Sequence, residues 1–290
     1  MQESFVIAID LDGTLLSSEH VISTTNRSIL RQVIDLGHHV LIATGRPLRT
    51  AVEYHRQLAL TTPLITLNGA AVWQPDGQTL LTEHVIESEV VDRIIQLAMS
   101  FHGFPLLAEV KEKCYQIPFQ PTQEWTQPMI DFFEKAILDE PLGQKPIPWH
   151  VGESLPFATS SLLISVPREQ HADFFTAVAS LHLDHVYCRA WHEPHNVIEI
   201  MARGVSKATA LRDVCERNGW QHKRIIAFGD EMNDVDMLKS ADFGIAMKNA
   251  NPSLVPFADA ITKSNDEHGV GTYLMSHVIM QQTNPLQRRA

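Results

Sequence analysis

Two carboxylates, Asp10 and Asp12, follow directly after the apolar run 5–9, and Gly13 comes next. Carboxylates this close in one cleft repel each other unless a proton or a cation lies between them. An all-oxygen ligand set suits Mg2+, whereas Zn2+ prefers the nitrogen and sulfur of His and Cys. An aspartate after a strand can also be a helix cap or a turn residue, so the spacing alone leaves both interpretations open.

Polar residues follow other apolar runs in the same manner. Thr44 closes the predicted strand 39–44, Asn68 follows 63–67, and Asp230 follows 224–228. The carboxyl ends of parallel strands share one edge of a sheet, and ligands bind at that edge. Asp234, four residues after Asp230, adds another carboxylate. The sequence therefore predicts an acidic cleft that a divalent cation would stabilise.

Positive charge is available from Lys207, at the start of a predicted helix, and from Arg46 in the stretch ATGRP. Thr44 offers a hydroxyl, and Gly45 exposes backbone N–H groups. A hydroxyl, backbone donors and a cation beside a metal are typical of a phosphate site. A helix lysine considered alone is more often solvated, so this interpretation depends on the carboxylates nearby.

The elements that would position these residues alternate between strand and helix. The expected strands are 5–9, 39–44 and 63–67 in the first part and 197–201, 224–228 and 243–247 in the last. Helices are expected after Ser23, over 48–58 and over 206–218. This order predicts an α/β fold with a Rossmann-like, doubly wound parallel sheet that has helices on both faces.

Residues 84–194 have a different pattern. A helix is expected over 88–101, a hairpin over 106–117, a strand over 161–166, a helix over 169–181 and a strand over 185–191. We therefore predict an α+β domain at 84–194, inserted into a catalytic core of residues 1–83 and 195–290.

The composition excludes several classes of protein. The chain has 290 residues and a net charge of -11, which argues against a nucleic-acid binder because such a protein needs a basic surface. No run approaches the ~18 apolar residues of a membrane helix, so no membrane association is expected. The three cysteines are far apart and show neither metal-site nor disulfide spacing, which favours a reducing, cytoplasmic location.

Four motifs resemble, in their order along the chain, those of the haloacid dehalogenase (HAD) superfamily phosphatases. They are DLDGTLL (10–16), ATGRP (43–47), Lys207 and GDEMND (229–234). The insert lies between the second and third motifs, as in the Cof-type, class IIB subfamily. Three further stretches are similar to that subfamily: TLNGA (66–70), AM-NA (246–250) and TKSNDEHGV (262–270). The resemblance covers nearly the whole chain and implies a HAD-type core with an inserted cap domain.

The resemblance also implies catalytic roles. Asp10 would be the nucleophile that forms an aspartyl phosphate. Asp12 would protonate the leaving alcohol and then activate water. Thr44 and Lys207 would hold the phosphoryl oxygens, and Lys207 would also offset the charge of Asp10.

The same resemblance implies a metal and further substrate contacts. Mg2+ would be bound by Asp10, the backbone carbonyl of Asp12 and Asp230, while Asn233 and Asp234 would orient these ligands or bind through water. The substrate-side contacts would come from Gly45, Arg46, Asn68 and Asn233.

Together these inferences predict a magnesium-dependent phosphatase that hydrolyses small phosphorylated metabolites. Sugar phosphates and phosphorylated cofactors, such as flavin mononucleotide or pyridoxal phosphate, fit this class. The inserted cap would exclude water and select the leaving group. The expected partner is a small phosphate ester, and the protein itself is expected to be a monomer or a small homo-oligomer.

Two alternatives stay open at the level of sequence. A phosphomutase or phosphotransferase would use the same motifs and pass the phosphoryl group to a sugar. A receiver-like phospho-acceptor domain would also use an acidic pocket, magnesium and a lysine, but Asp12 and the long insert argue against it. No GxxxxGK[ST] stretch indicates a P-loop, and no GxGxxG follows the first strand.

Overall fold

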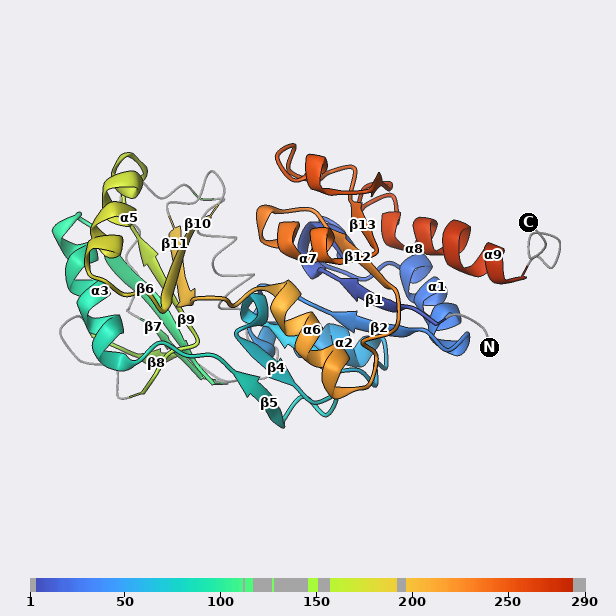
Figure 1. Ribbon diagram of the computed structural model, residues 1–290, viewed down its shortest axis with the longest axis horizontal. Coiled ribbons are helices and arrows are strands. Elements are labelled where there is room, and N and C mark those ends of the chain that lie inside the picture. The colour runs from blue at the N-terminus through green and yellow to red at the C-terminus, as the bar shows by residue number, and fades with distance from the viewer. Residues whose placement is uncertain are drawn as a thin grey trace. The chain divides into compact units, whose positions relative to one another are not determined.

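The structure is a computed structural model that describes residues 4–111, 113–116, 127, 146–150, 157–191 and 197–283 (Figure 1). Its helices are α1 (Thr24–Asp35), α2 (Leu48–Gln57), α3 (Ser88–Ser100), α5 (His171–Ser180), α6 (Lys207–Arg217), α7 (Val235–Ser240), α8 (Gly269–Leu274) and α9 (Met280–Thr283). Among the described residues, none of these helices has the length and apolarity needed to cross a membrane.

The strands form three sheets. They are β1 (Val6–Ile9), β2 (His39–Ile42), β3 (Leu64–Thr66), β4 (Ala71–Trp73), β5 (Leu80–Glu83), β6 (Phe104–Val110), β7 (Lys113–Gln116), β8 (Ile147–Pro148), β9 (Ser161–Ser165), β10 (Val186–Ala190), β11 (Val197–Ala202), β12 (Ile225–Gly229), β13 (Phe243–Ala246) and β14 (Ala260–Ile261). By its internal contacts the chain divides into two units. Unit 1 comprises Met1–Gly45, Ala51–Leu80 and Ser206–Ala290, and unit 2 comprises Arg46–Thr50 and Leu81–Val205.

The sequence predicts domain boundaries at 83/84 and 194/195. The two units of the structure divide near 80/81 and 205/206, and the segment Arg46–Thr50 groups with unit 2. The assignment of residues 84–194 to an independent cap domain stays a prediction.

Unit 1 is built on a parallel sheet with the strand order β14-β13-β12-β1-β2. The central strand β1 is fully buried along Val6–Ile9, as its continuous apolar run predicted. The connections β1–α1–β2 and β12–α7–β13 run in opposite directions across the sheet, so right-handed crossovers place α1 and α7 on opposite faces. Helix α8 packs on α1, and α6 packs on α7. The predicted doubly wound α/β fold is therefore confirmed.

One strand predicted for this core is elsewhere. The sequence pattern predicts the run 197–201 as a strand of the parallel core, and that prediction is wrong: β11 pairs antiparallel with β9 and β10. A short buried apolar run has the same pattern in either kind of sheet, so periodicity could not separate them. The strand 63–67 also differs, since β3 pairs antiparallel with β4 and meets the parallel sheet through the single bridge Ala43–Ile65.

Unit 2 contains the six-stranded sheet β10-β11-β9-β6-β7-β8. Helices α3 and α5 pack against each other, and α3 packs on β6 and β9. Ile94, Leu162 and Phe174 are fully buried members of the shared core. The expected hairpin is present as β6 and β7, and the mixed helix and antiparallel strand content is as the sequence predicted.

The edge of the parallel sheet matters most for chemistry. Asp10 follows β1, Asp230 follows β12, and Thr44 lies two residues after β2. Strands β1 and β12 are neighbours in register, and the backbone N–H of Asp10 donates to the carbonyl of Phe228 at 3.2 Å. The first two carboxylates are therefore brought side by side by strand pairing alone.

Truncation of the central strand should destabilise unit 1. Ile7 is 0% exposed, so Ile7→Ala leaves a cavity and should lower the free energy of unfolding by about 3 kcal/mol. Val21 is 51% exposed, and Val21→Ala should change it by less than about 0.5 kcal/mol. Urea unfolding measures both values, and equal values for the two variants would contradict the burial of β1.

Candidate active site

The site is organised around the buried side chain of Lys207, the first residue of α6. The helix begins there because Ser206 is its N-cap, accepting a hydrogen bond from the backbone N–H of Thr209 at 3.2 Å. Lys207 is 0% exposed, and its ammonium donates to Oδ1 of Asp10 at 2.5 Å and to Oδ1 of Asp234 at 2.7 Å. A buried ammonium needs such partners. Lys207 is therefore a buried, ion-paired residue and not a solvated helix lysine.

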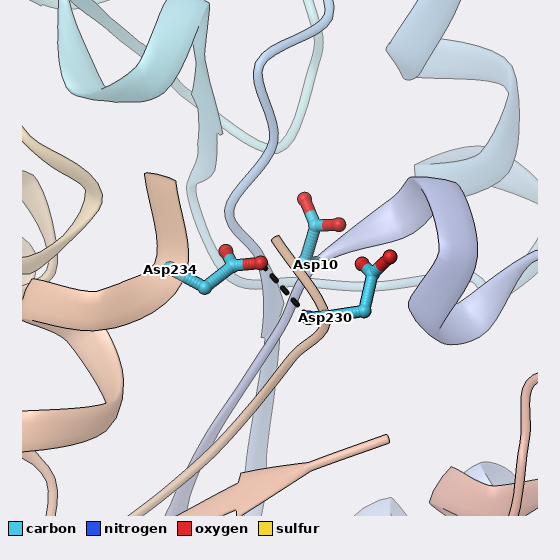
Figure 2. Close-up of side chains that lie close together, drawn as sticks. All are labelled: Asp10, Asp230 and Asp234. Atoms are coloured by element: carbon cyan, nitrogen blue, oxygen red, sulfur yellow. Dashed lines mark hydrogen bonds between the residues drawn. The ribbon is translucent and has the colours of Figure 1, made fainter. Parts of the chain in front are cut away.

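Asp234 joins the loop after β12 to Lys207. Its Oδ2 accepts the backbone N–H of Asp230 at 3.0 Å, the bond drawn in Figure 2. The same oxygen accepts the backbone N–H of Glu231 at 3.1 Å, and Oδ1 accepts a hydrogen bond from Lys207. Both oxygens are thus already bonded within the protein. Asp234 is therefore suited to holding the loop and the lysine in place.

Asp10 and Asp230 are the two carboxylates that remain for a ligand. Single oxygens of Asp10, Asp230 and Asp234 all lie within 4.8 Å of one another, and Figure 2 shows the three side chains converging. Oδ1 of Asp230 accepts a hydrogen bond from the hydroxyl of Thr14 at 2.9 Å. Thr14 belongs to the turn after β1, so this bond joins the two strand ends a second time.

The charges in this cluster do not balance. Burial raises the pKa of Asp10 from 3.8 to about 7; Lys207 lowers it, and Asp234 raises it. Burial also raises the pKa of Asp230 to about 9, and the charges of Asp10 and Asp234 add to this effect. Burial alone would lower the pKa of Lys207, but the two carboxylates outweigh burial and raise it.

A divalent cation fits this arrangement. The three carboxylates and one ammonium leave an excess of two negative charges, which one such cation would neutralise. Oδ1 of Asn233 is buried and has no hydrogen-bond partner, so a further oxygen ligand is available next to the cluster. The donors are all oxygens, and oxygen donors favour a hard cation over zinc.

The turn after Asp10 requires glycine at position 13. Gly13 has φ +70, and a Cβ added there would lie 2.1 Å from Oδ2 of Asp230. The residue therefore allows both the left-handed turn and the close approach of a carboxylate. This close approach of Asp230 accounts for the glycine that directly follows Asp12 in the DLDGT motif.

A second group of predicted residues lies together around two side-chain amides. Asn68 adopts a left-handed conformation with φ +54, and its Oδ1 accepts a hydrogen bond from Nδ2 of Asn233 at 2.9 Å. Its backbone N–H donates to the carbonyl of Thr44 at 3.0 Å, and a Cβ on Gly45 would lie 3.2 Å from its Oδ1. The structure thus brings Thr44, Gly45, Asn68 and Asn233 together, and their predicted contacts with substrate stay a prediction.

The turn at Asn68 also contacts the helix that carries the lysine. Gly69 has φ +100, and a Cβ there would lie 2.3 Å from the carbonyl of Ser206. Only glycine permits both this backbone conformation and this approach. The Asn68 turn therefore packs on the N-cap of α6, immediately before Lys207.

Asp12 lies outside the tight carboxylate cluster. Its side chain is 35% exposed, and its Oδ1 lies 3.5 Å from Nδ1 of His20. A partly exposed carboxylate can exchange protons with a substrate or water, which the predicted acid–base role requires. The predicted metal contact of Asp12 was through its backbone carbonyl, and that contact stays a prediction.

Arg46 is 6% exposed, and its Nη1 donates to the carbonyl of Thr50 at 3.4 Å. Its segment groups with unit 2, so its predicted substrate contact stays a prediction.

Two residues near the site were missed from sequence. Thr14 carried a signal, because it is the threonine of the DLDGT motif, whereas His20 carried none and is brought near Asp12 by the loop.

Comparison with known proteins gives a consistent answer. A family model for haloacid dehalogenase-like hydrolases matches residues 7–274. The 5-amino-6-(5-phospho-D-ribitylamino)uracil phosphatase YitU of Bacillus subtilis (strain 168) is 33% identical over 274 residues, covering 94% of this chain and 97% of that protein. The pyridoxal phosphate phosphatase YbhA of Escherichia coli (strain K12) is 27% identical over 286 residues, covering 94% and 98%.

Solved structures agree. The structure of a haloacid dehalogenase-like hydrolase from B. subtilis matches with a TM-score of 0.75 at 27% identity and covers 94% of this chain and 99% of that one. The chain therefore belongs to the haloacid dehalogenase-like hydrolase family, and it is an enzyme of the phosphatase type. The resemblance noted from the four motifs is confirmed.

Replacement of the buried lysine should destabilise the fold. Lys207→Met leaves Asp10 and Asp234 without their cation and should lower the free energy of unfolding at neutral pH by about 3–5 kcal/mol. The exposed Lys239 provides the control Lys239→Met, which should have no comparable effect. Urea denaturation would contradict the structural role of Lys207 if both variants matched the wild type.

The raised carboxyl pKa values predict a pH dependence of stability. In metal-free protein Asp10 and Asp230 keep their protons in the folded state to higher pH than in the unfolded chain. Stability should therefore fall as pH rises from about 5 to about 8, by up to about 1.4 kcal/mol per pH unit for each proton involved.

The same measurement distinguishes the role of Asp230. Asp230→Asn should flatten this slope, whereas the exposed control Asp35→Asn should keep it. Addition of MgCl2 should stabilise the wild type more at about pH 8 than at about pH 5, because the cation replaces protons. A wild-type slope of zero would contradict the charge imbalance of the cluster.

Proposed function

We propose that this enzyme is a Mg2+-dependent phosphatase that hydrolyses small phosphorylated metabolites through an aspartyl phosphate on Asp10. The observation that carries this proposal is the buried Asp10–Lys207 pair beside Asp230 at the edge of the parallel sheet. Lys207 binds one oxygen of Asp10, and the second oxygen of the carboxylate is then the one that attacks phosphorus.

The proposed reaction has two steps. In the first, Asp10 forms a bond to phosphorus while the bond to the leaving oxygen breaks, and Asp12 donates a proton to that oxygen. In the second, Asp12 takes a proton from water, the water oxygen attacks phosphorus, and Asp10 is released as a carboxylate. The partial exposure of Asp12 supports this role, since its carboxyl must exchange protons in both steps.

The remaining residues stabilise negative charge. Lys207, the hydroxyl of Thr44 and the backbone N–H of Gly45 would face the phosphoryl oxygens. Bound Mg2+ would supply positive charge for the transferring group. Asp10, Asp230 and the carbonyl of Asp12 would hold the cation, with Asn233 and Asp234 orienting the others.

The proposed substrates follow from the relatives. A relative at 33% identity is named for a ribitylaminouracil phosphate, and one at 27% for pyridoxal phosphate. We therefore rank phosphorylated cofactors and their precursors, with flavin mononucleotide among them, ahead of simple sugar phosphates. Unit 2 would act as the cap that selects the leaving group.

Substitution of the nucleophile provides the decisive test. Asp10→Asn should lower Mg2+-dependent phosphate release by at least about a thousandfold, because the amide cannot form the intermediate. The substrates to compare are p-nitrophenyl phosphate, 5-amino-6-(5-phospho-D-ribitylamino)uracil, pyridoxal 5′-phosphate, flavin mononucleotide and glucose 6-phosphate. The exposed Asp35 provides the control Asp35→Asn, which should stay fully active.

Equal activity of Asp10→Asn and the wild type would refute the proposed nucleophile.

Hydrolysis is distinguished from transfer by the products. Inorganic phosphate should appear in equal amount to the released alcohol, even with glucose added as a competing acceptor. Phosphorylated glucose in place of inorganic phosphate would instead indicate a phosphotransferase.

A further inference from the structure

The loop that carries Asp12 is held by side chains from the far end of the chain. Nδ2 of Asn249 donates to the carbonyl of Gly13 at 2.7 Å, and Nδ2 of Asn265 donates to the carbonyl of Leu16 at 2.9 Å. These pairs are 236 and 249 residues apart in sequence. The backbone N–H of Asn265 also donates to Oδ1 of Asn249 at 3.0 Å, so the two asparagines are bonded to each other.

The side chains of two more residues, Asp266 and Asn26, also bind the segment that follows Asp12. Asp266 accepts the backbone N–H of Ser18 at 2.8 Å through Oδ1 and the hydroxyl of Ser18 at 2.6 Å through Oδ2. The side chain of Asn26 makes two further bonds: its Nδ2 donates to the carbonyl of Leu15 at 3.4 Å, and its Oδ1 accepts the backbone N–H of Gly271 at 3.0 Å. Side-chain amides therefore bind the carbonyls of residues 13, 15 and 16.

This bonding compensates for an irregular backbone. Asp12 has ψ 129 and Gly13 has φ 70, so the chain leaves regular geometry immediately after the nucleophile. Backbone carbonyls in such a turn lack sheet partners, and buried ones need another donor. Asn265 is only 8% exposed, and its bond to Leu16 is buried.

We propose that Asn249 and Asn265 are positioning residues for the acid–base step: by holding the carbonyls of Gly13 and Leu16 they fix the backbone that orients the Asp12 carboxylate. We call this pair the asparagine clamp. The inference rests on the proposed function, since it takes Asp12 as the proton donor. The stretch TKSNDEHGV, which includes Asn265, has no part in the phosphatase mechanism described above, and the clamp gives it one.

The position of the clamp explains why it should affect catalysis. Asn249 bonds to the carbonyl of Gly13, the residue that follows Asp12, so it restrains the backbone from which the Asp12 side chain projects. The orientation of that side chain therefore depends in part on the clamp. A displacement of about 1 Å at a reacting group can reduce the rate by about a hundredfold.

The test compares two esters whose leaving groups differ in their need for a proton. Phenyl phosphate releases a phenol that is a poor leaving group without protonation, whereas p-nitrophenolate leaves readily as an anion. In Asn249→Ala the single-turnover rate constant should fall for both esters, but the fall for phenol release should be at least about tenfold larger than the fall for p-nitrophenol release. KM for both esters should stay close to the wild-type value, because Thr44 and Lys207 are untouched.

Reference variants separate positioning from a general loss of structure. Asp12→Asn should lower the rate of phenol release relative to that of p-nitrophenol release by a still larger factor. Lys248 is adjacent to Asn249 with a side chain that is 67% exposed, and Lys248→Ala should leave the ratio of the two rates unchanged. Asn265→Ala is the second clamp variant, and its rate ratio should shift in the same direction as that of Asn249→Ala.

Each outcome decides a separate claim. A wild type that releases neither alcohol would overturn the proposed function. An active wild type whose Asn249→Ala variant keeps the wild-type ratio would overturn the clamp alone, whether or not both rates fall. If Asn265→Ala does not fold, the exposed position of Asn249 keeps the first variant informative.

Discussion

The arrangement of unit 1 depends on one buried ammonium group. Lys207 lies between Asp10 and Asp234 with no exposed surface, and its two ion pairs join helix α6 to the ends of strands β1 and β12. Removal of three charged groups from water is costly, and it is tolerated only when each charge has a partner. The remaining imbalance of charge cannot be relieved by the protein itself. It requires protons or a cation, so the interaction that organises the fold also creates a candidate cation site.

The loop after β1 shows how an irregular backbone is kept in place. Strand β1 ends at Ile9, and residues of the following loop contact groups that are distant in sequence: Thr14 donates to Asp230, and Asn265 donates to Leu16. Such bonds cost conformational entropy in several segments at once, and the assembled sheet is what brings these segments together. The conformation of this loop is therefore set by tertiary hydrogen bonds and not by local structure.

Unit 2 stabilises its sheet in a different way. Its strand β11 carries Glu199, which is 3% exposed and is paired with Arg189 on the neighbouring strand β10. Glu109 on β6 is similarly buried and forms a bidentate pair with Arg49. Buried ion pairs contribute little net stability compared with apolar packing, but they penalise wrong pairings because an unpaired buried charge is costly. The charge of this sheet thus favours one register over the alternatives.

The sequence by itself determined the doubly wound core and named candidate site residues, because the apolar runs and the polar residues that end them are local patterns. It also predicted that Asp10 and Asp230 lie at one edge of the sheet, because the carboxyl ends of parallel strands lie together. Only the tertiary structure decided the pairing of β11, because a short buried run has the same pattern in parallel and antiparallel sheets. Only the tertiary structure, likewise, brought Asn249 to the carbonyl of Gly13, since no local pattern encodes a hydrogen bond across 236 residues.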